Sequence, residues 1–101
     1  SFQSPAYNAV KMIEAAMGGE PFTLPAGCYV NCDKLGYKNV MMAMPTTIDK
    51  TGVHFTAPQG TEEEMASLAK SYEHLCKMRD EIVELGIVPA VADWAKENPN
   101  L

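Results

Sequence analysis

One long amphipathic helix, predicted from Thr61 to Gly86, constrains the fold of this 101-residue chain more than any other feature. One face of this helix carries residues at steps of three and four, and all of these residues are apolar except one arginine: Met65, Leu68, Tyr72, Leu75, Arg79 and Ile82. Thr61 and Glu64 match a capping box, and Gly86 followed by Pro89 predicts the end. About 25 residues make a helix of ~37 Å, whereas a compact domain of this size has a diameter of about 34 Å. The helix must therefore protrude into water or be covered by a neighbouring domain, and we favour the neighbour.

A second amphipathic helix is predicted at the start of the chain, from Ser4 to Met17. Its apolar residues again follow steps of three and four: Ala6, Ala9, Val10, Ile13, Ala16 and Met17. We expect Ser4 to cap this helix and Pro5 to occupy its first position, where a missing N–H costs nothing. The Gly18-Gly19 pair predicts the end, because glycine adopts the left-handed conformation without penalty.

Between the two helices, the sequence predicts about three strands. We expect Gly27–Cys32 and Asn39–Ile48 to be strands, with Pro45 at an edge position or a bulge. Asp49–Gly52 is a turn signal, so residues 53–57 would return as the next strand of a hairpin. After the long helix we expect only a short turn, Ala90 to Lys96. The predicted fold is α+β: one domain over residues 1–101, with a small antiparallel sheet packed against an N-terminal helix and a long C-terminal helix.

The composition excludes some classes of partner. The net charge is −5, with only eight Lys and Arg, which argues against a surface for nucleic acid or anionic membrane. No apolar run approaches the roughly 18 residues that a membrane helix needs.

Side chains that could carry chemistry are few. The three cysteines, Cys28, Cys32 and Cys76, are odd in number and do not match zinc spacing, so we expect reduced, partly buried thiols in a cytosolic protein. We expect His54 and His74 at the surface or at its boundary with the core, and no metal site. Three methionines of the second strand are expected to fill the core: Met41, Met42 and Met44. From pattern alone, the chain is an α+β domain without a self-sufficient active site.

Three stretches, taken together, point to a family. They are SFQSPAYNAVKMIEAAMGGEPFTLPAGCYVN, NVMMAMPTTIDKTGVHF and SYEHLCKMRDEIVELGIVPAVADWAKENPNL. In this order they resemble the end of NAD-dependent malate dehydrogenases of the Bacteroides and Porphyromonas type, within the lactate/malate dehydrogenase family. The resemblance implies that residues 1–101 are the C-terminal substrate domain, and that an N-terminal Rossmann domain, which binds NAD, is absent. That domain is the neighbour we expect over the long helix.

The resemblance implies few functional residues in this chain. Ser1 would face a carboxylate of the bound acid, and Pro5 would pack near the nicotinamide ring. The competing interpretations are that Ser1 is only a frayed terminus and Pro5 only the first helical residue. The family's proton-transfer pair, a His and an Asp, has no counterpart here, so we expect no catalytic residue in this chain. Family enzymes also hold their substrate with several arginines, whereas Arg79 is the only arginine.

The implied activity belongs to the intact parent. That enzyme would be cytoplasmic and would interconvert malate and oxaloacetate by hydride transfer with NAD. We expect this fragment alone to be inactive and not to bind NAD. Its partners would be its own Rossmann domain and further copies in a homo-oligomer. Two alternatives stay open: a dehydrogenase of the same family that acts on lactate or another 2-hydroxy acid, and a non-enzymatic module that docks a partner through the long helix.

Overall fold

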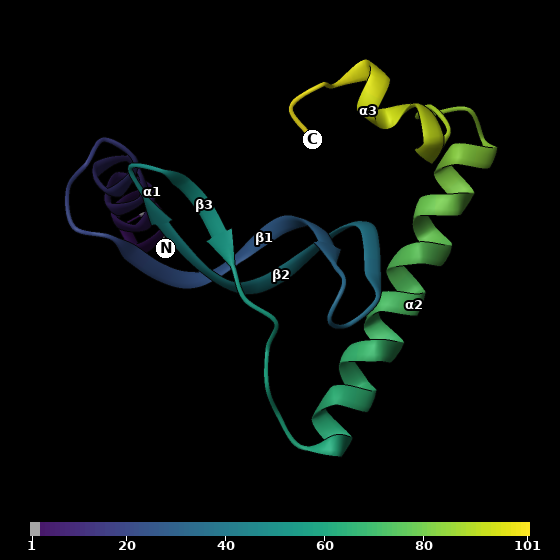
Figure 1. Ribbon diagram of the computed structural model, residues 1–101, viewed down its shortest axis with the longest axis horizontal. Coiled ribbons are helices and arrows are strands. Elements are labelled where there is room, and N and C mark those ends of the chain that lie inside the picture. Colours follow the sequence, from purple (N-terminus) through teal and green to yellow (C-terminus); the bar gives the residue numbers. More distant parts are fainter. Residues whose placement is uncertain (1–2) are drawn as a thin grey trace. The chain divides into compact units, whose positions relative to one another are not determined.

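The computed structural model describes residues 3–101 and confirms the predicted α+β class. In chain order its elements are α1 (Gln3–Ala16), β1 (Phe22–Cys32), β2 (Tyr37–Asp49), β3 (Gly52–Phe55), α2 (Glu62–Glu84), the 3-10 turn η1 (Val91–Asp93) and α3 (Trp94–Glu97) (Figure 1). The sheet order is β1-β2-β3, and β3 runs antiparallel to β2. Within the described residues, none of the helices is both long enough and apolar enough to cross a bilayer.

The chain forms two compact units. The first contains the residues up to Cys28 together with Met42–Pro58, and the second contains Tyr29–Met41 together with Gln59–Leu101. The first unit therefore holds α1, β3 and the adjoining parts of β1 and β2. The second holds the other ends of β1 and β2, with α2 and everything after it.

The strand β1 is longer than the sequence predicted. It begins at Phe22 rather than at Gly27, and it includes Pro25, whose side chain is exposed. The sheet order explains why this proline is tolerated, because β1 is an edge strand and a proline nitrogen can face away from the ladder there. Within the first unit, Thr23 Oγ1 and Thr47 Oγ1 share a hydrogen bond of 3.0 Å between β1 and β2.

The hairpin of β2 and β3 forms at the predicted turn. Asp49 pairs with Gly52, whose φ of 124° lies in the region that favours glycine. Pairing continues as far as Thr46 opposite Phe55, where β3 ends. One residue further, the Thr56 N–H donates to the Pro45 carbonyl at 3.0 Å, but Pro45 has no N–H to return the bond. Pro45 is therefore at a local edge, as predicted.

Alternating side chains of β2 form most of the core of the first unit. Met42, Met44, Thr46 and Ile48 are buried, and so are Cys28 and Ala15. The Thr46 hydroxyl is satisfied there, because it donates to the Met44 carbonyl at 2.8 Å. The prediction that all three methionines fill the core is wrong for Met41, which is 62% exposed. Side chains alternate along a strand, so Met41 projects to the face opposite Met42.

The helix α1 packs on a different face from the one predicted. Ala15 is completely buried, whereas the predicted apolar face, which includes Val10, Ile13 and Met17, is exposed. Ser4, predicted as the N-cap, is instead already helical. The small Ala15 is thus the buried position of α1, and the bulkier apolar residues face outward. The predicted end is confirmed, with Gly18 at a φ of 98°.

The helix α2 begins and ends where the sequence predicted. Thr61 accepts a hydrogen bond from the Glu64 N–H, and the Glu64 carboxylate accepts one from the Thr61 N–H, both at 3.1 Å. These two bonds complete the capping box. The pKa of Glu64 is lowered, chiefly by the bond that its carboxylate accepts from the Thr61 N–H and then by the Thr61 side chain. Gly86 follows the helix at a φ of 72°. No residue of α2 is fully buried.

Candidate functional site

A bulge at Asn39 organises the second unit. Asn39 is a non-glycine residue with a positive φ, at 57°. The alternation of buried and exposed side chains along β2 is interrupted there. Tyr37 and Val40 are both buried although they are three residues apart, whereas residues on one face of a regular strand are two apart. The Asn39 N–H donates to the Asn31 side chain at 3.2 Å, and the Asn39 side chain accepts a bond from the Tyr29 hydroxyl. Such a bulge diverts backbone groups from the ladder, so they need other partners.

Arg79 supplies a partner for the diverted carbonyls. One of its terminal nitrogens, Nη1, donates to the carbonyls of Lys38 and Asn39 at 3.1 and 3.2 Å. Its Nε donates to Asp80 at 3.0 Å. The side chain is only 19% exposed. This arrangement explains why an arginine interrupts the apolar stripe of α2.

Two tyrosines hold the hairpin of β1 and β2 against α2. The rings of Tyr37 and Tyr72 stack, with centroids 4.2 Å apart and an interplanar angle of 16°. The Lys38 N–H donates to the Tyr72 hydroxyl at 2.9 Å. The pKa of Tyr72 is raised, chiefly by a hydrogen bond with the Cys76 thiol.

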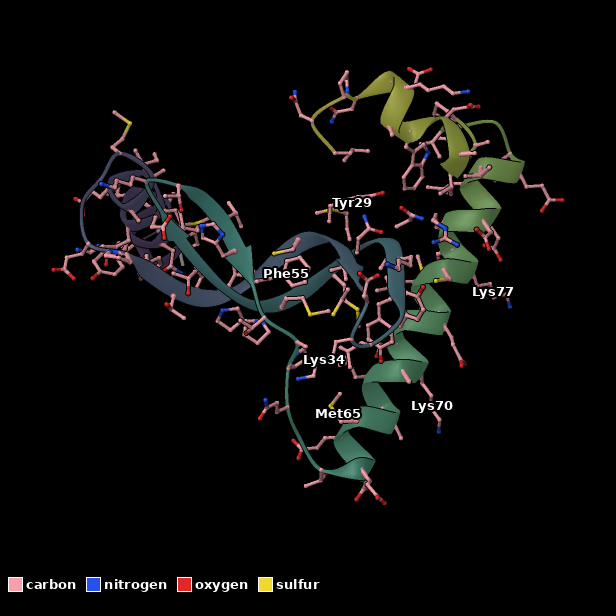
Figure 2. All side chains as sticks on the ribbon, viewed as in Figure 1. Tyr29, Lys34, Phe55, Met65, Lys70 and Lys77 are labelled. Carbon is pink, nitrogen blue, oxygen red and sulfur yellow. The ribbon has the colours of Figure 1, made fainter. Side chains whose placement is uncertain are left out.

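A cavity of about 280 Å³ lies within the second unit. It is bounded by the β1–β2 hairpin, α2 and the C-terminal segment, and its lining is mostly apolar: Tyr29, Asn39, Val40, Met41, Leu75, Met78, Arg79, Ile82 and Trp94. Tyr29 and Trp94 form a tilted ring pair with centroids 6.2 Å apart. Figure 2 shows Tyr29 on the hairpin, whereas Lys70 and Lys77 point away from the hairpin on the other side of α2.

The cavity suits an apolar group better than a dicarboxylate. Its polar side chains already have partners: the Tyr29 hydroxyl donates to Asn39 at 2.5 Å, and the Trp94 ring N–H donates to the Pro89 carbonyl at 2.8 Å. Arg79 is engaged by the bulge carbonyls and Asp80, so its charge is not presented to the cavity as a bidentate clamp. Sequence reasoning missed this cavity, because it depends on packing between distant segments.

The two substrate and cofactor residues implied by the resemblance remain predictions. Ser1 lies outside the described residues. Pro5 is exposed in the first turn of α1 and belongs to the first unit. The roles assigned to both residues are therefore not tested by the fold.

The start of α2 does not fit the pyrophosphate of a dinucleotide. A pyrophosphate would need a helix N-terminus with free amides and no opposing charge. At the start of α2, however, the capping box occupies two of the amides, and Glu62, Glu63 and Glu64 surround them with negative charge. Among residues 3–101 there is also no group of three or more His, Cys, Asp or Glu side chains placed to hold a metal ion.

His54 lies in an exposed cluster at the β2–β3 turn, and His74 is exposed on α2. The Nε2 atom of His54 is 2.7 Å from the Thr51 hydroxyl and 3.2 Å from the Asp49 carboxylate. Thr51 also donates to Asp49 from its backbone N–H, at 2.8 Å. These bonds join Asp49, Thr51 and His54 across the turn between β2 and β3, so the cluster stabilises the turn. The surface positions predicted for both histidines are confirmed.

This cluster gives a pH-dependent prediction. The pKa of Asp49 is lowered, chiefly by the hydrogen bond from the Thr51 hydroxyl and then by the Thr51 backbone N–H. A lowered folded pKa adds stability above the unfolded value near 3.8, and this stability is lost as the pH falls through the folded pKa. In Thr51→Val, we expect the pKa of Asp49 to move upward towards 3.8. Carboxyl chemical shifts followed through an acid titration measure it, and an unchanged Asp49 midpoint would contradict the assignment.

The three cysteines are free thiols, as predicted. Cys28 and Cys32 are buried, and Cys76 is partly exposed. Cys28 Sγ lies 3.2 Å from the Thr46 hydroxyl inside the first unit. These environments are typical of small core side chains.

The comparison with known proteins gives a distant, partial similarity. The chain is 34% identical over 74 residues to the malate dehydrogenase of Geobacillus kaustophilus (strain HTA426). This alignment covers 72% of the chain but only 23% of that enzyme, so the chain corresponds to a small part of its relative. No family model matches the chain. The similarity agrees in its family with the resemblance read from the sequence, and it gives no support to the narrower bacterial type.

Proposed function

We propose that this chain is the C-terminal substrate domain of an NAD-dependent malate dehydrogenase. The observation that carries the proposal is the 34% identity over 74 residues to the Geobacillus enzyme. The finer assignment, to the Bacteroides and Porphyromonas type, rests on the opening stretch and on the VPAVADWAKENPNL ending. The predicted cytoplasmic location is part of the same proposal.

The structural chemistry supports a division of labour with a second domain. The start of α2 is acidic and capped, and Arg79 is held by the bulge at Asn39. In this proposal, NAD binding and the proton-transfer pair belong to an N-terminal Rossmann domain. Ser1 would contact the substrate and Pro5 the nicotinamide, both from the domain described here. A homo-oligomer of the whole enzyme is proposed with it.

A chimera tests the proposal directly. The matching C-terminal segment of the Geobacillus enzyme is replaced with this chain, and malate-dependent reduction of NAD is measured. We expect activity at least about 100-fold above the same enzyme truncated before the segment, because substrate positioning is lost without it. The isolated chain is a second control and should neither bind NAD nor oxidise malate. A chimera that is folded by circular dichroism but no more active than the truncated enzyme would contradict the proposal.

The same assay, together with the gene sequence upstream of this chain, separates the alternatives. A chimera that prefers lactate to malate would favour a related 2-hydroxy-acid dehydrogenase, although the upstream domain also contributes to that choice. A Rossmann fingerprint encoded upstream in the same reading frame would exclude a free-standing docking module. A start codon immediately before Ser1 would favour the module.

A further inference from the structure

The cavity of the second unit has no role in the proposed dehydrogenase chemistry, although it has the form of a binding site. Its walls come from three segments of one unit: the hairpin of β1 and β2, the helix α2, and α3. Exposure is graded along the lining, since Val40 is buried, whereas Met78 is 50% exposed and Met41 is 62% exposed. The cavity therefore has a floor at Val40 and a mouth at the two methionines, and the chain itself surrounds it.

The lining favours a neutral ligand over a charged one. Arg79 is its charged residue, and each nitrogen of the guanidinium already has an acceptor. Nη1 donates to two backbone carbonyls at 3.1 and 3.2 Å, and Nε and Nη2 both lie 3.0 Å from the Asp80 carboxylate. That carboxylate also balances the positive charge. A carboxylate or phosphate group that entered the cavity would lose its hydration without gaining a free cation, and such a loss is costly.

The volume of the cavity sets the size of the ligand. An apolar cavity of about 150 Å³ holds one benzene molecule, whereas this cavity measures about 280 Å³. A single ring, whether free or on a side chain inserted from another domain, would leave about half of it empty and would forfeit dispersion contacts there. Two fused rings fill it better. The rings of Tyr29 and Trp94 and the polarizable sulfurs of Met41 and Met78 favour an aromatic ligand.

We propose that this cavity binds a neutral aromatic molecule with two fused rings. The ligand lies against Val40, with its rings beside Tyr29 and Trp94. The side chains of Met41 and Met78 at the mouth close over it, because flexible thioether side chains adapt to the shape of a ligand. This inference does not rest on the proposed dehydrogenase function, since the cavity contains neither of the residues assigned to malate or NAD.

Titration of the full chain with 2-naphthol tests the proposal. This probe has two fused rings and is neutral at neutral pH, and for a ligand of its size we expect a dissociation constant of roughly 0.1–1 mM. Nuclear magnetic resonance follows the backbone amides and the ring N–H of Trp94, the only tryptophan. 2-Naphthoate, which has the same rings and a negative charge, should bind at least about tenfold more weakly. Equal binding of the two probes, or unshifted signals from the lining residues, would overturn the proposal.

A matched pair of variants locates the site. Met78→Trp places a larger ring system at the mouth of the cavity and should weaken the binding of 2-naphthol by at least about tenfold. Met17→Trp makes the same change in the first unit, at a methionine that is 82% exposed and does not line the cavity, and should leave the binding unchanged. Circular dichroism checks that both variants fold. Equal dissociation constants in the two variants would place the probe elsewhere and contradict the proposal.

The chimera described above distinguishes a ligand site from a surface that the rest of a longer protein covers. When this chain is joined to the remainder of the Geobacillus enzyme, 2-naphthol should still bind within about threefold of its affinity for the chain alone. Met78→Trp in the chimera should again weaken this binding, which separates it from binding at any site of the added domain. A folded chimera in which this Met78-dependent binding is lost would mean that the neighbouring domain fills the cavity, and the proposal would fail. The readout is binding, so this failure is distinct from a loss of malate oxidation.

Discussion

Replacement of Arg79 by methionine is expected to lower the free energy of unfolding by about 2–4 kcal/mol, because it removes charged hydrogen-bond donors from a partly buried site. Methionine keeps most of the apolar stem that packs beside the cavity, so the change isolates the loss of the guanidinium. Without it, the Lys38 and Asn39 carbonyls at the bulge lose their donor. These carbonyls cannot return to the ladder while Asn39 keeps its positive φ.

The control for Arg79→Met removes the exposed partner instead. Asp80 contacts the same guanidinium, but its side chain is 65% exposed, so Asp80→Ala should change the free energy of unfolding by less than about 0.5 kcal/mol. Urea unfolding followed by the fluorescence of Trp94, the only tryptophan of the chain, reports on the same unit. Equal losses in the two variants would mean that the bulge does not depend on the arginine.

Local sequence patterns predicted those parts of the fold that local physics determines. The capping box at Thr61 and Glu64, the turn before Gly52 and the end of α2 near Gly86 each depend on a few adjacent residues. The consequence of Pro45 was also predictable, since a missing N–H must interrupt a ladder wherever the strand is paired.

Features set by distant partners were not predictable in the same way. Arg79 interrupts an apolar stripe for a reason found forty residues away, in the carbonyls of a bulge that only the folded hairpin exposes. The cavity beside Trp94 was not predictable for the same reason, because the segments that line it, from β1, β2, α2 and α3, lie far apart in the sequence. The face of α1 was misjudged, since its pattern carries apolar residues on more than one side and only packing selects Ala15.

The candidate site follows the same division. Residue patterns correctly placed His54 and His74 at the surface and the cysteines as free thiols. The proposed roles of Ser1 and Pro5 come from family resemblance alone. If the substrate pocket is shared by two domains, as we propose, neither domain carries a complete pattern, because the distance between its groups is fixed only when the domains meet.

Truncation of Met44 to alanine is the second large effect that we expect, with a loss of about 2–4 kcal/mol in the free energy of unfolding. Met44 is 1% exposed and is among the largest fully buried side chains of the described residues. Alanine removes three heavy atoms from the side chain and leaves a cavity that the surrounding strand can close only in part. The backbone of β2 is paired on this segment, which further limits collapse.

Met41→Ala is the matched control, since it makes the same chemical change three residues earlier on the same strand. Met41 is 62% exposed, so we expect a loss within about 0.5 kcal/mol. Urea unfolding monitored by circular dichroism compares the two variants, and the difference between them measures burial alone, because strand propensity and side-chain chemistry are held constant. A strand whose register slipped by one residue would exchange the two faces and reverse the order of the losses. The sign of that difference therefore tests the register of β2 as well as the depth of its core.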